Sequence, residues 1–310
     1  MKVSIIGAGN VGATIAYAAL IQGVVSEIAL VDIDRKKARA EALDLNHGMM
    51  FVSPAKVYDG DFDAVEESKI VVVTAGAKQK EGQTRLDLAK TNTAILKDMM
   101  PRLVAKAPDA VYVIVTNPVD VLTYVALKVA GLPRNRVFGS GTVLDTSWFR
   151  YLIGMHCSVS VKNVHGYIVG EHGDSEVPLW STVTMGGVRM EEYCVSCVNH
   201  CSDEEKRGIY TVVRDSAYEI IAAKGATYYA IGLTTAKLIE SVLRNERRIF
   251  TVSSRLDNYL GVSDVCLSVP QIVDASGCER IVPLKIADQE LAAFRRSAEV
   301  VREAIRSVGF

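Results

Sequence analysis

The sequence predicts an α/β protein, with a doubly wound parallel sheet in its first half and an α+β second half. Two observations support this prediction. Short valine-rich runs recur through the first 140 residues, with room for a helix between them, and each ends in a polar or glycine-rich turn. Such continuous apolar runs are typical of parallel strands that helices cover on both faces. Beyond residue 141 the spacing is lost, and short strand-like runs mix with long helical ones.

Length and composition narrow the class of protein. The chain has 310 residues, 49% of them hydrophobic, and a formal net charge of −1. It can therefore bury one large core or two ordinary ones. Near-neutral charge without a basic block argues against nucleic-acid binding. No apolar run has membrane-spanning length, and glycines follow the first run too early for a signal peptide. Six cysteines are few for this length, so we expect a reduced, cytoplasmic setting.

The first elements are a strand, a glycine turn and a helix. Residues 3–6 form an apolar run, and residues 13–21 have a helical pattern. In the turn between them, Gly7 allows a tight bend, Gly9 lets the backbone approach a pyrophosphate, and Gly12 allows the helix to pack closely on the strand. The phosphates would lie at the helix N-terminus, where free amides and the helix dipole favour anions. This unit predicts a dinucleotide site.

The residues that end the next strand indicate which dinucleotide the site binds. Residues 27–31 form an apolar run that ends at Asp32, twenty residues after Gly12. A carboxylate there can hold a ribose diol and repels a 2′-phosphate. Asp34 adds to that repulsion. We therefore predict NAD as the cofactor rather than NADP.

Two more strands are expected at residues 69–73 and 111–115. Ligands of parallel sheets bind beyond the carboxyl ends of the strands, so Asn117 is expected in the crevice. The alternative is that Asn117 simply forms a turn before Pro118. Between these strands, residues 78–85 are polar apart from one glycine and lead into a helix from residue 86. They are interpreted as a lid over the crevice, or else as an ordinary solvated loop.

A single histidine has the setting of a proton-transfer group. His172 stands between Gly170 and Gly173, directly after the apolar run at residues 164–169. Glycines on both sides of a residue favour a turn, which here would place the imidazole at the end of a strand. A histidine in that position can move a proton near neutral pH if another group fixes its tautomer. The alternative is a turn histidine with no chemical role.

The second half is read from its pattern because no linker marks its start. We expect a dinucleotide-binding domain over residues 1–140 and a second, catalytic domain over residues 141–310. The pattern predicts strands at 159–169, 249–252 and 265–269 and helices at 204–223, 232–244 and 288–308.

Three cysteines are close together in this half. Cys194, Cys197 and Cys201, with His200 beside them, have spacings that place the thiols on one helical face. A CxxC pair can bind zinc, but only one pair is present, and cysteines on a helix face usually pack as small hydrophobes. We expect packing here and no metal.

Several further motifs follow in order. They are Thr116-Asn117-Pro118-Val119-Asp120, Gly139-Ser140-Gly141-Thr142, Leu144-Asp145 and Gly170-Glu171-His172-Gly173-Asp174-Ser175. With the glycine turn and the lid, they make the chain resemble the L-lactate/malate dehydrogenase family along its whole length, and the bacterial L-lactate dehydrogenases within it. The resemblance implies a Rossmann-type first domain and reversible hydride transfer between NADH and a 2-oxo acid of the pyruvate type, as in fermentation.

The resemblance also implies roles for individual residues. His172 would protonate the substrate carbonyl, Asp145 would fix its tautomer, and Arg85 would polarise the carbonyl when the lid closes. Neutral Gln79 would suit a monocarboxylic substrate, where an arginine would pair a second carboxylate. The remaining substrate positions are Asn117, Trp148 and Thr227, and the cofactor positions are Gly7, Gly9, Val11, Gly12, Asp32, Gly76, Ala77, Asn117, Ser140 and Ile231.

A second, allosteric site is implied outside the catalytic pocket. Arg150 and His165 match the residues that bind fructose 1,6-bisphosphate between subunits in allosteric bacterial lactate dehydrogenases, so a homotetramer is expected. The alternative is an ordinary surface arginine and a strand histidine.

One position departs from the family. Where the family carries an arginine that grips the substrate carboxylate, this chain has Trp148. Trp148 lies three residues after Asp145 and so shares its helix face, whereas Arg150 lies about 140° further round and cannot replace it. Loss of a buried bidentate contact to a carboxylate typically costs about 2–5 kcal/mol of binding free energy. Three interpretations stay open: a lactate dehydrogenase with weakened activity, a reductase of another carbonyl or imine compound, and an NAD-binding protein that has lost turnover.

Overall fold

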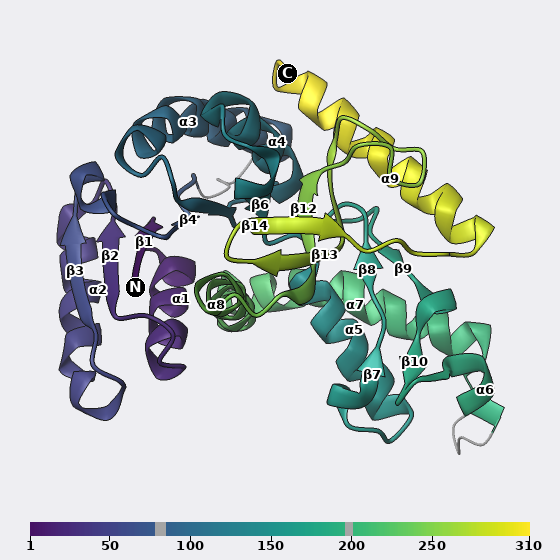
Figure 1. The fold of residues 1–310 in the computed structure, drawn as a ribbon. Coiled ribbons are helices and arrows are strands. Elements are labelled where there is room, and N and C mark those ends of the chain that lie inside the picture. Colours follow the sequence, from purple (N-terminus) through teal and green to yellow (C-terminus); the bar gives the residue numbers. More distant parts are fainter. Residues whose placement is uncertain (78–84, 196–200) are drawn as a thin grey trace.

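The computed structural model describes residues 1–77, 85–195 and 201–310. One nine-stranded sheet runs through the molecule in the order β14-β13-β12-β6-β5-β4-β1-β2-β3 (Figure 1). The strands of this sheet are β1 (Lys2–Ile6), β2 (Glu27–Val31), β3 (Lys56–Gly60), β4 (Ile70–Val73), β5 (Val111–Ile114), β6 (Val137–Gly139), β12 (Arg248–Arg255), β13 (Cys266–Asp274) and β14 (Gly277–Ile281).

The first six strands confirm the predicted doubly wound sheet. They pair in parallel, and β4 and β5 are fully buried along their length. Parallel pairing ends at β6, close to where the sequence pattern changes. The sheet itself continues, because β12, β13 and β14 extend it with antiparallel pairs. The sequence pattern did not reveal this extension.

Helices from both halves of the chain cover the sheet. In Figure 1, α1 and α8 lie together on one face, and α3 and α4 cover the other. A Cβ on Gly232 of α8 would lie 2.5 Å from Thr14 Cγ2 of α1, so the two helices touch where no side chain intervenes. The helices are α1 (Asn10–Ile21), α2 (Arg35–His47), α3 (Arg85–Lys106), α4 (Val119–Ala130), α5 (Val143–His156), α6 (Met190–Val195), α7 (Asp203–Lys224), α8 (Tyr229–Arg244) and α9 (Asp288–Ser307).

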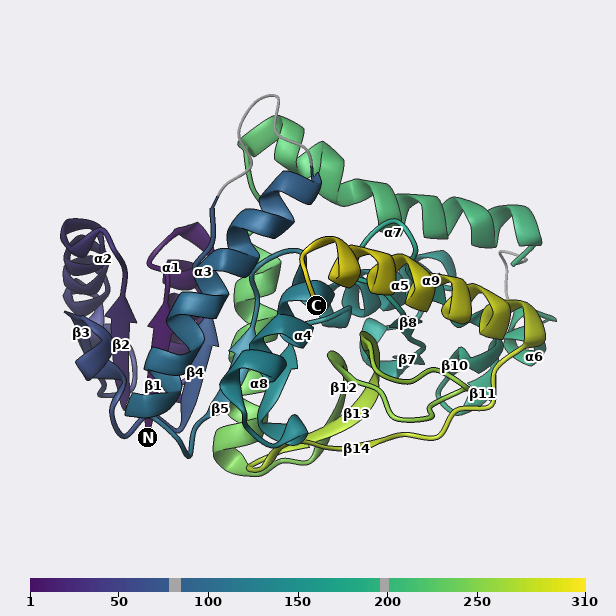
Figure 2. The ribbon, with the colours of Figure 1, turned by 90° about the horizontal axis from the view of Figure 1, so that it is seen from above.

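The middle of the chain forms two small sheets beside the large one. The single strand expected over residues 159–169 is wrong: a 3-10 turn at Val161–Asn163 comes first, and β7 and β8 then pair in different sheets. Seen from above, α7 runs along the outside of this region (Figure 2). The short strands are β7 (Val164–His165), β8 (Ile168–Val169), β9 (Val177–Pro178), β10 (Thr184–Met185) and β11 (Val188–Arg189), and the other 3-10 turns are Met49–Phe51, Phe62–Val65, Arg134–Arg136 and Trp180–Thr182.

The expected helical face of cysteines is also wrong. Helix α6 ends at Val195, and Cys201 lies outside any helix, just before α7. Cys197 and His200 lie outside the described residues. Within the described part of the chain, no helix is long and apolar enough to cross a membrane.

Candidate active site

The glycine turn borders a cavity of about 1130 Å³ at the carboxyl end of the parallel strands. Gly7 has a φ of +105°, and a Cβ there would lie 2.7 Å from Ala75 N. A Cβ on Gly12 would lie 1.9 Å from Gly7 O, whereas one on Gly9 would meet nothing within 4 Å. Close packing therefore requires glycine at positions 7 and 12, whereas the backbone of Gly9 borders open space in the cavity. Within residues 1–77, 85–195 and 201–310, no side chain caps α1, so its first amides can receive an anion.

Asp32 is fixed at the end of β2. Its two carboxylate oxygens accept backbone hydrogen bonds from Ala8 N at 2.7 Å and Asp34 N at 2.9 Å. Arg35, a cation that lines the same cavity, is already paired with Asp59 at 3.4 Å and Asp61 at 3.7 Å. This corner of the cavity suits a neutral diol better than a phosphate.

A buried asparagine that the sequence analysis did not single out connects two loops of the cavity. Asn92 on α3 is 1% exposed, accepts a hydrogen bond from Ala77 N at 2.8 Å, and donates one to Asn117 O at 2.9 Å. An asparagine inside a long helix is unfavourable for the helix, which is a weak signal of such a role. Asn92 thereby holds the loop at Ala77 against the loop that carries Asn117.

His172 and Asp145 form a close pair. The structure places His172 Nδ1 2.6 Å from Asp145 Oδ2. Asp145 lies in the first turn of α5, and His172 lies in the turn after β8. Attraction to the Asp145 carboxylate outweighs the effect of burial and raises the pKa of His172 to about 9. The imidazole is therefore protonated at neutral pH, and its Nδ1–H donates to Asp145.

Two further groups hold the histidine turn, and the sequence analysis assigned no role to either. Asp120 is 2% exposed and accepts hydrogen bonds from His172 N at 2.8 Å and Ser253 Oγ at 2.6 Å. Burial raises the pKa of Asp120 to about 6. Ser297 of α9 accepts a hydrogen bond from Glu171 N at 2.8 Å. Elements distant in sequence thus fix the backbone on which the imidazole sits.

A buried glutamate completes this group of titratable side chains. Glu176 is 6% exposed, and no group in the described part of the chain forms a hydrogen bond with its Oε1. Burial, followed by the Asp145 charge, raises its pKa to about 9. Glu176 is therefore a neutral acid at pH 7, close to a carboxylate and an imidazolium.

Trp148 lies on α5, one turn after Asp145. Its ring stacks on Tyr151, with centroids 5.2 Å apart and planes 9° apart. The indole N–H is buried and has no hydrogen-bond partner among the residues that the structure describes. A buried donor without a partner is uncommon and usually indicates strain or a missing ligand.

The expected effector residues lie on two packed elements, Arg150 on α5 and His165 on β7. Arg150 Nε donates to Gly166 O at 2.9 Å, one residue from His165, and its guanidinium lies over the Tyr167 ring at 5.3 Å. Burial lowers the pKa of Arg150. His165 is exposed.

The other predicted positions are distributed around the cavity. Asn117 lines it, while His172 and Asp145 are not among its described lining residues. Ser140 is buried at the end of β6. Thr227 and Ile231 are half-buried, just before and within α8. Gln79 and the side chain of Arg85 lie outside the described residues. Val11, Gly76 and Ala77 also line the cavity.

Comparisons with known proteins agree along the whole chain. Residues 1–139 match the lactate/malate dehydrogenase NAD binding domain, and residues 142–309 match the lactate/malate dehydrogenase alpha/beta C-terminal domain. The chain is 49% identical to the L-lactate dehydrogenase of Acetivibrio thermocellus, over 99% of this chain and 97% of that protein. It is 48% identical to the L-lactate dehydrogenase of Thermoanaerobacter pseudethanolicus, over 99% of each.

Solved structures show the same likeness. The minor L-lactate dehydrogenase from Enterococcus mundtii, in its ligands-bound form, superposes with a TM-score of 0.96 at 42% identity, over 99% of this chain and 98% of that one. A lactate dehydrogenase from a Medee basin deep-sea metagenome also gives 0.96, at 39% identity, over 100% of this chain and 99% of that one.

Proposed function

Because the chain belongs to the lactate/malate dehydrogenase family and carries its NAD-binding domain, we propose that it is an L-lactate dehydrogenase that reduces pyruvate with NADH. The observation that carries this proposal is the pair of His172 and Asp145, joined at 2.6 Å. The names of relatives 44–49% identical over nearly their whole length support the choice of substrate.

The described residues fit NAD. The open space over Gly9 and the uncapped amides of α1 suit a pyrophosphate. Asp32, held by two backbone amides, suits the ribose diol. When bound, the nicotinamide supplies the hydride for the reduction.

The protein's own contribution is proton transfer and charge stabilisation. His172 is protonated at neutral pH, so it can give a proton to the carbonyl oxygen as the carbonyl is reduced. Asp145 holds Nδ1–H, which leaves Nε2–H to face the substrate, and it stabilises the imidazolium. Arg85, at the start of α3, would add positive charge to the oxygen when the lid closes.

The substrate is proposed to carry a single carboxylate, because Gln79 has no charge to pair with a second one. Trp148 cannot supply the charged, two-pronged contact that an arginine gives. We therefore propose that turnover of pyruvate is weaker than an arginine at this position would allow.

A second candidate function follows from Trp148. Its buried indole N–H has no partner within the described residues, and its ring is apolar and carries no charge. Those features suit a carbonyl or imine substrate that lacks a carboxylate or carries a larger apolar group. A protein that only binds NAD is less favoured, because it would not need His172 and Asp145 to be paired.

Assembly and regulation are part of the proposal. We propose a cytoplasmic homotetramer in which Arg150 and the exposed His165 contribute to a fructose 1,6-bisphosphate site between subunits. Support comes from the placement of both residues about Gly166.

Steady-state assays with NADH test the proposed function. Pyruvate, oxaloacetate, a longer 2-oxo acid, a simple ketone and a cyclic imine would each be compared in wild type and in His172→Gln. We expect pyruvate to have the highest kcat/KM and the variant to lose it. A ketone or imine preferred by tenfold would favour the second candidate, and no turnover of any compound would leave NAD binding alone.

A further inference from the structure

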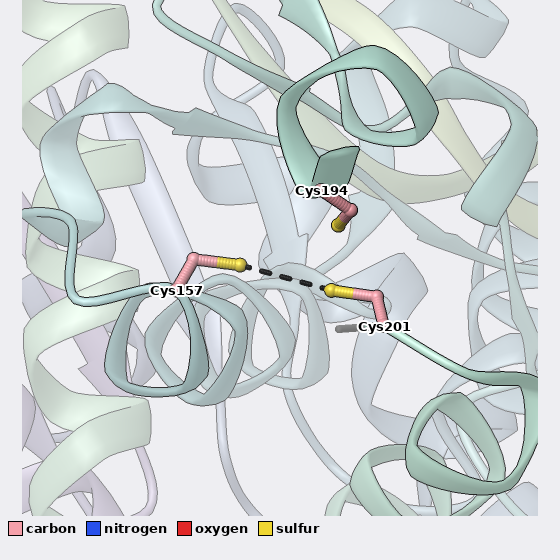
Figure 3. A group of neighbouring side chains, drawn as sticks. All are labelled: Cys157, Cys194 and Cys201. Atoms are coloured by element: carbon pink, nitrogen blue, oxygen red, sulfur yellow. Dashed lines mark hydrogen bonds between the residues drawn. The ribbon is translucent and has the colours of Figure 1, made fainter. Parts of the chain in front are cut away.

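Three cysteine thiols from separate parts of the second half converge at one place (Figure 3). Cys157 caps the C-terminus of α5, Cys194 lies in the last turn of α6, and Cys201 lies just before α7. Their sulfur atoms all lie within 4.8 Å of one another, and those of Cys157 and Cys201 are 4.0 Å apart. The proposed lactate dehydrogenase activity uses none of them.

The surroundings of this cysteine triad are apolar on one side and open on the other. Cys157 is 4% exposed, while Cys194 and Cys201 are half-buried. All three pack on the hydrophobic cluster that contains Ile153 and Val213. The protein therefore supplies three soft sulfur ligands with a dry wall behind them, and an ion could enter from the solvent side.

The distances favour a bound ion over a disulfide. A zinc-like ion lies about 2.3 Å from each sulfur, which puts the sulfurs roughly 3.8–4.0 Å apart. The sulfurs of Cys157 and Cys201 already have that spacing, and no pair needs to close by more than about 1 Å. A disulfide between them would require about 2 Å of closure and an oxidant.

We propose that Cys157, Cys194 and Cys201 form a three-thiolate site for a thiophilic closed-shell ion of the zinc class. The fourth position of a tetrahedral ion would face the solvent side. This ligand set could not be found from the sequence, because Cys157 lies 37 residues before Cys194. The spacing of Cys194 and Cys201 suggested a helix face instead.

Such an ion would cross-link the C-terminus of α5, the last turn of α6 and the start of α7. Of the residues of α7, Val213 is the one that is buried, so little apolar surface fixes this long helix. Cys157 lies twelve residues after Asp145 on α5, about 18 Å along the helix axis. The site would thus hold the start of α7 against the far end of the helix that carries Asp145, without touching the reacting groups.

Cadmium titration of the full-length protein tests this proposal. The protein would carry Cys197→Ala, so that only described thiols near the site can respond, and would be reduced and desalted under nitrogen. We expect one equivalent of Cd²⁺ to produce a thiolate-to-cadmium ultraviolet band with the intensity of three thiolates. Zn²⁺ in 100-fold excess over its Kd should raise Tm by roughly 5 °C.

Variants locate the ligands. Cys157→Ser and Cys201→Ser should each weaken Cd²⁺ binding at least tenfold and reduce the band. The matched control is Cys278→Ser, a buried thiol near Arg134 and outside the triad, which should leave both unchanged. If Cys157→Ser unfolds, as judged by circular dichroism, the half-buried Cys194→Ala serves in its place.

Three results would overturn the proposal. They are a band no stronger in the parent than in Cys194→Ala, an equal loss in Cys278→Ser, and a protein that binds no Cd²⁺ after reduction but becomes two hydrogen atoms lighter in air. The last would mean that two thiols form a disulfide. None of these results would bear on pyruvate reduction, which His172→Gln tests separately.

Discussion

Replacing Asp145 with asparagine should shift the pH dependence of pyruvate reduction. The carboxylate is the largest cause of the raised pKa of His172, from 6.5 to about 9. Asparagine has nearly the same shape but no charge, so the pKa of His172 should return toward its ordinary value. Reduction needs the protonated imidazole, and a group with a raised pKa stays protonated until the pH passes that raised value.

The size of the effect follows from the protonated fractions. At pH 8, about 90% of His172 is protonated with a pKa near 9, but only about 3% with a pKa near 6.5, a ~30-fold difference. At pH 5.5 both proteins are more than ~90% protonated, so protonation contributes almost nothing to the difference there. Any loss from misorienting the imidazole should be the same at both pH values.

The assay is kcat/KM for pyruvate at saturating NADH between pH 5.5 and 9.5. We expect the Asp145→Asn deficit to grow ~30-fold from pH 5.5 to pH 8. The matched control is Asp174→Asn, which removes a nearby carboxylate that accepts a hydrogen bond from Tyr218 rather than from His172. A deficit that stays constant with pH would refute the assignment of Asp145 as the group that holds the proton on His172.

Four further outcomes are expected. Trp148→Arg should raise kcat/KM for pyruvate by about 30-fold or more, from the 2–5 kcal/mol of a buried charged contact, and should leave a ketone without a carboxylate no better; no gain on pyruvate would count against the position assigned to Trp148. Fluorescence titration should show that NADH binds at least tenfold tighter than NADPH, and the ratio of the two dissociation constants should be smaller in Asp32→Ser. Fructose 1,6-bisphosphate should favour the tetramer in sedimentation and lower the KM for pyruvate, and Arg150→Gln or His165→Gln should abolish both effects. Glu176 binds its proton more tightly in the folded protein, so its contribution to the free energy of unfolding falls as pH rises from about 5 to about 9. Glutamine does not titrate, so the free energy of unfolding of Glu176→Gln, measured by urea denaturation, should rise by about 1–3 kcal/mol relative to that of wild type over this pH range.

Local chemistry explains which parts of the site could be predicted. The glycine turn, Asp32 and the strand-end position of Asn117 follow from backbone geometry within a few residues, and the sequence indicates them directly. The glycines around His172 indicated a proton-transfer histidine, the family resemblance supplied its role towards the substrate carbonyl, and the structure adds its 2.6 Å contact with Asp145.

Long-range packing explains what could not be predicted. The antiparallel extension of the sheet by β12 and the contact of Gly232 with Thr14 join residues more than 100 positions apart. Asp120 and Glu176 carry no signal in their own segments, because their burial depends on elements packed from elsewhere. The same holds for Cys157, whose neighbours in space are not its neighbours in sequence.

The shared sheet limits how this protein can be divided. The apolar layer beneath β1 and β2 contains Ile15 and Phe138 from the first half together with Leu238 and Val252 from the second. A fragment cut at residue 140 would leave that layer open to water, with β6 as a bare edge ready to pair with other chains. The nucleotide-binding half is therefore unsuitable as a portable module for fusion proteins. Only the second half of the chain can cover the exposed layer. Fragments 1–140 and 141–310 should therefore be soluble when they are co-expressed, although neither is soluble alone.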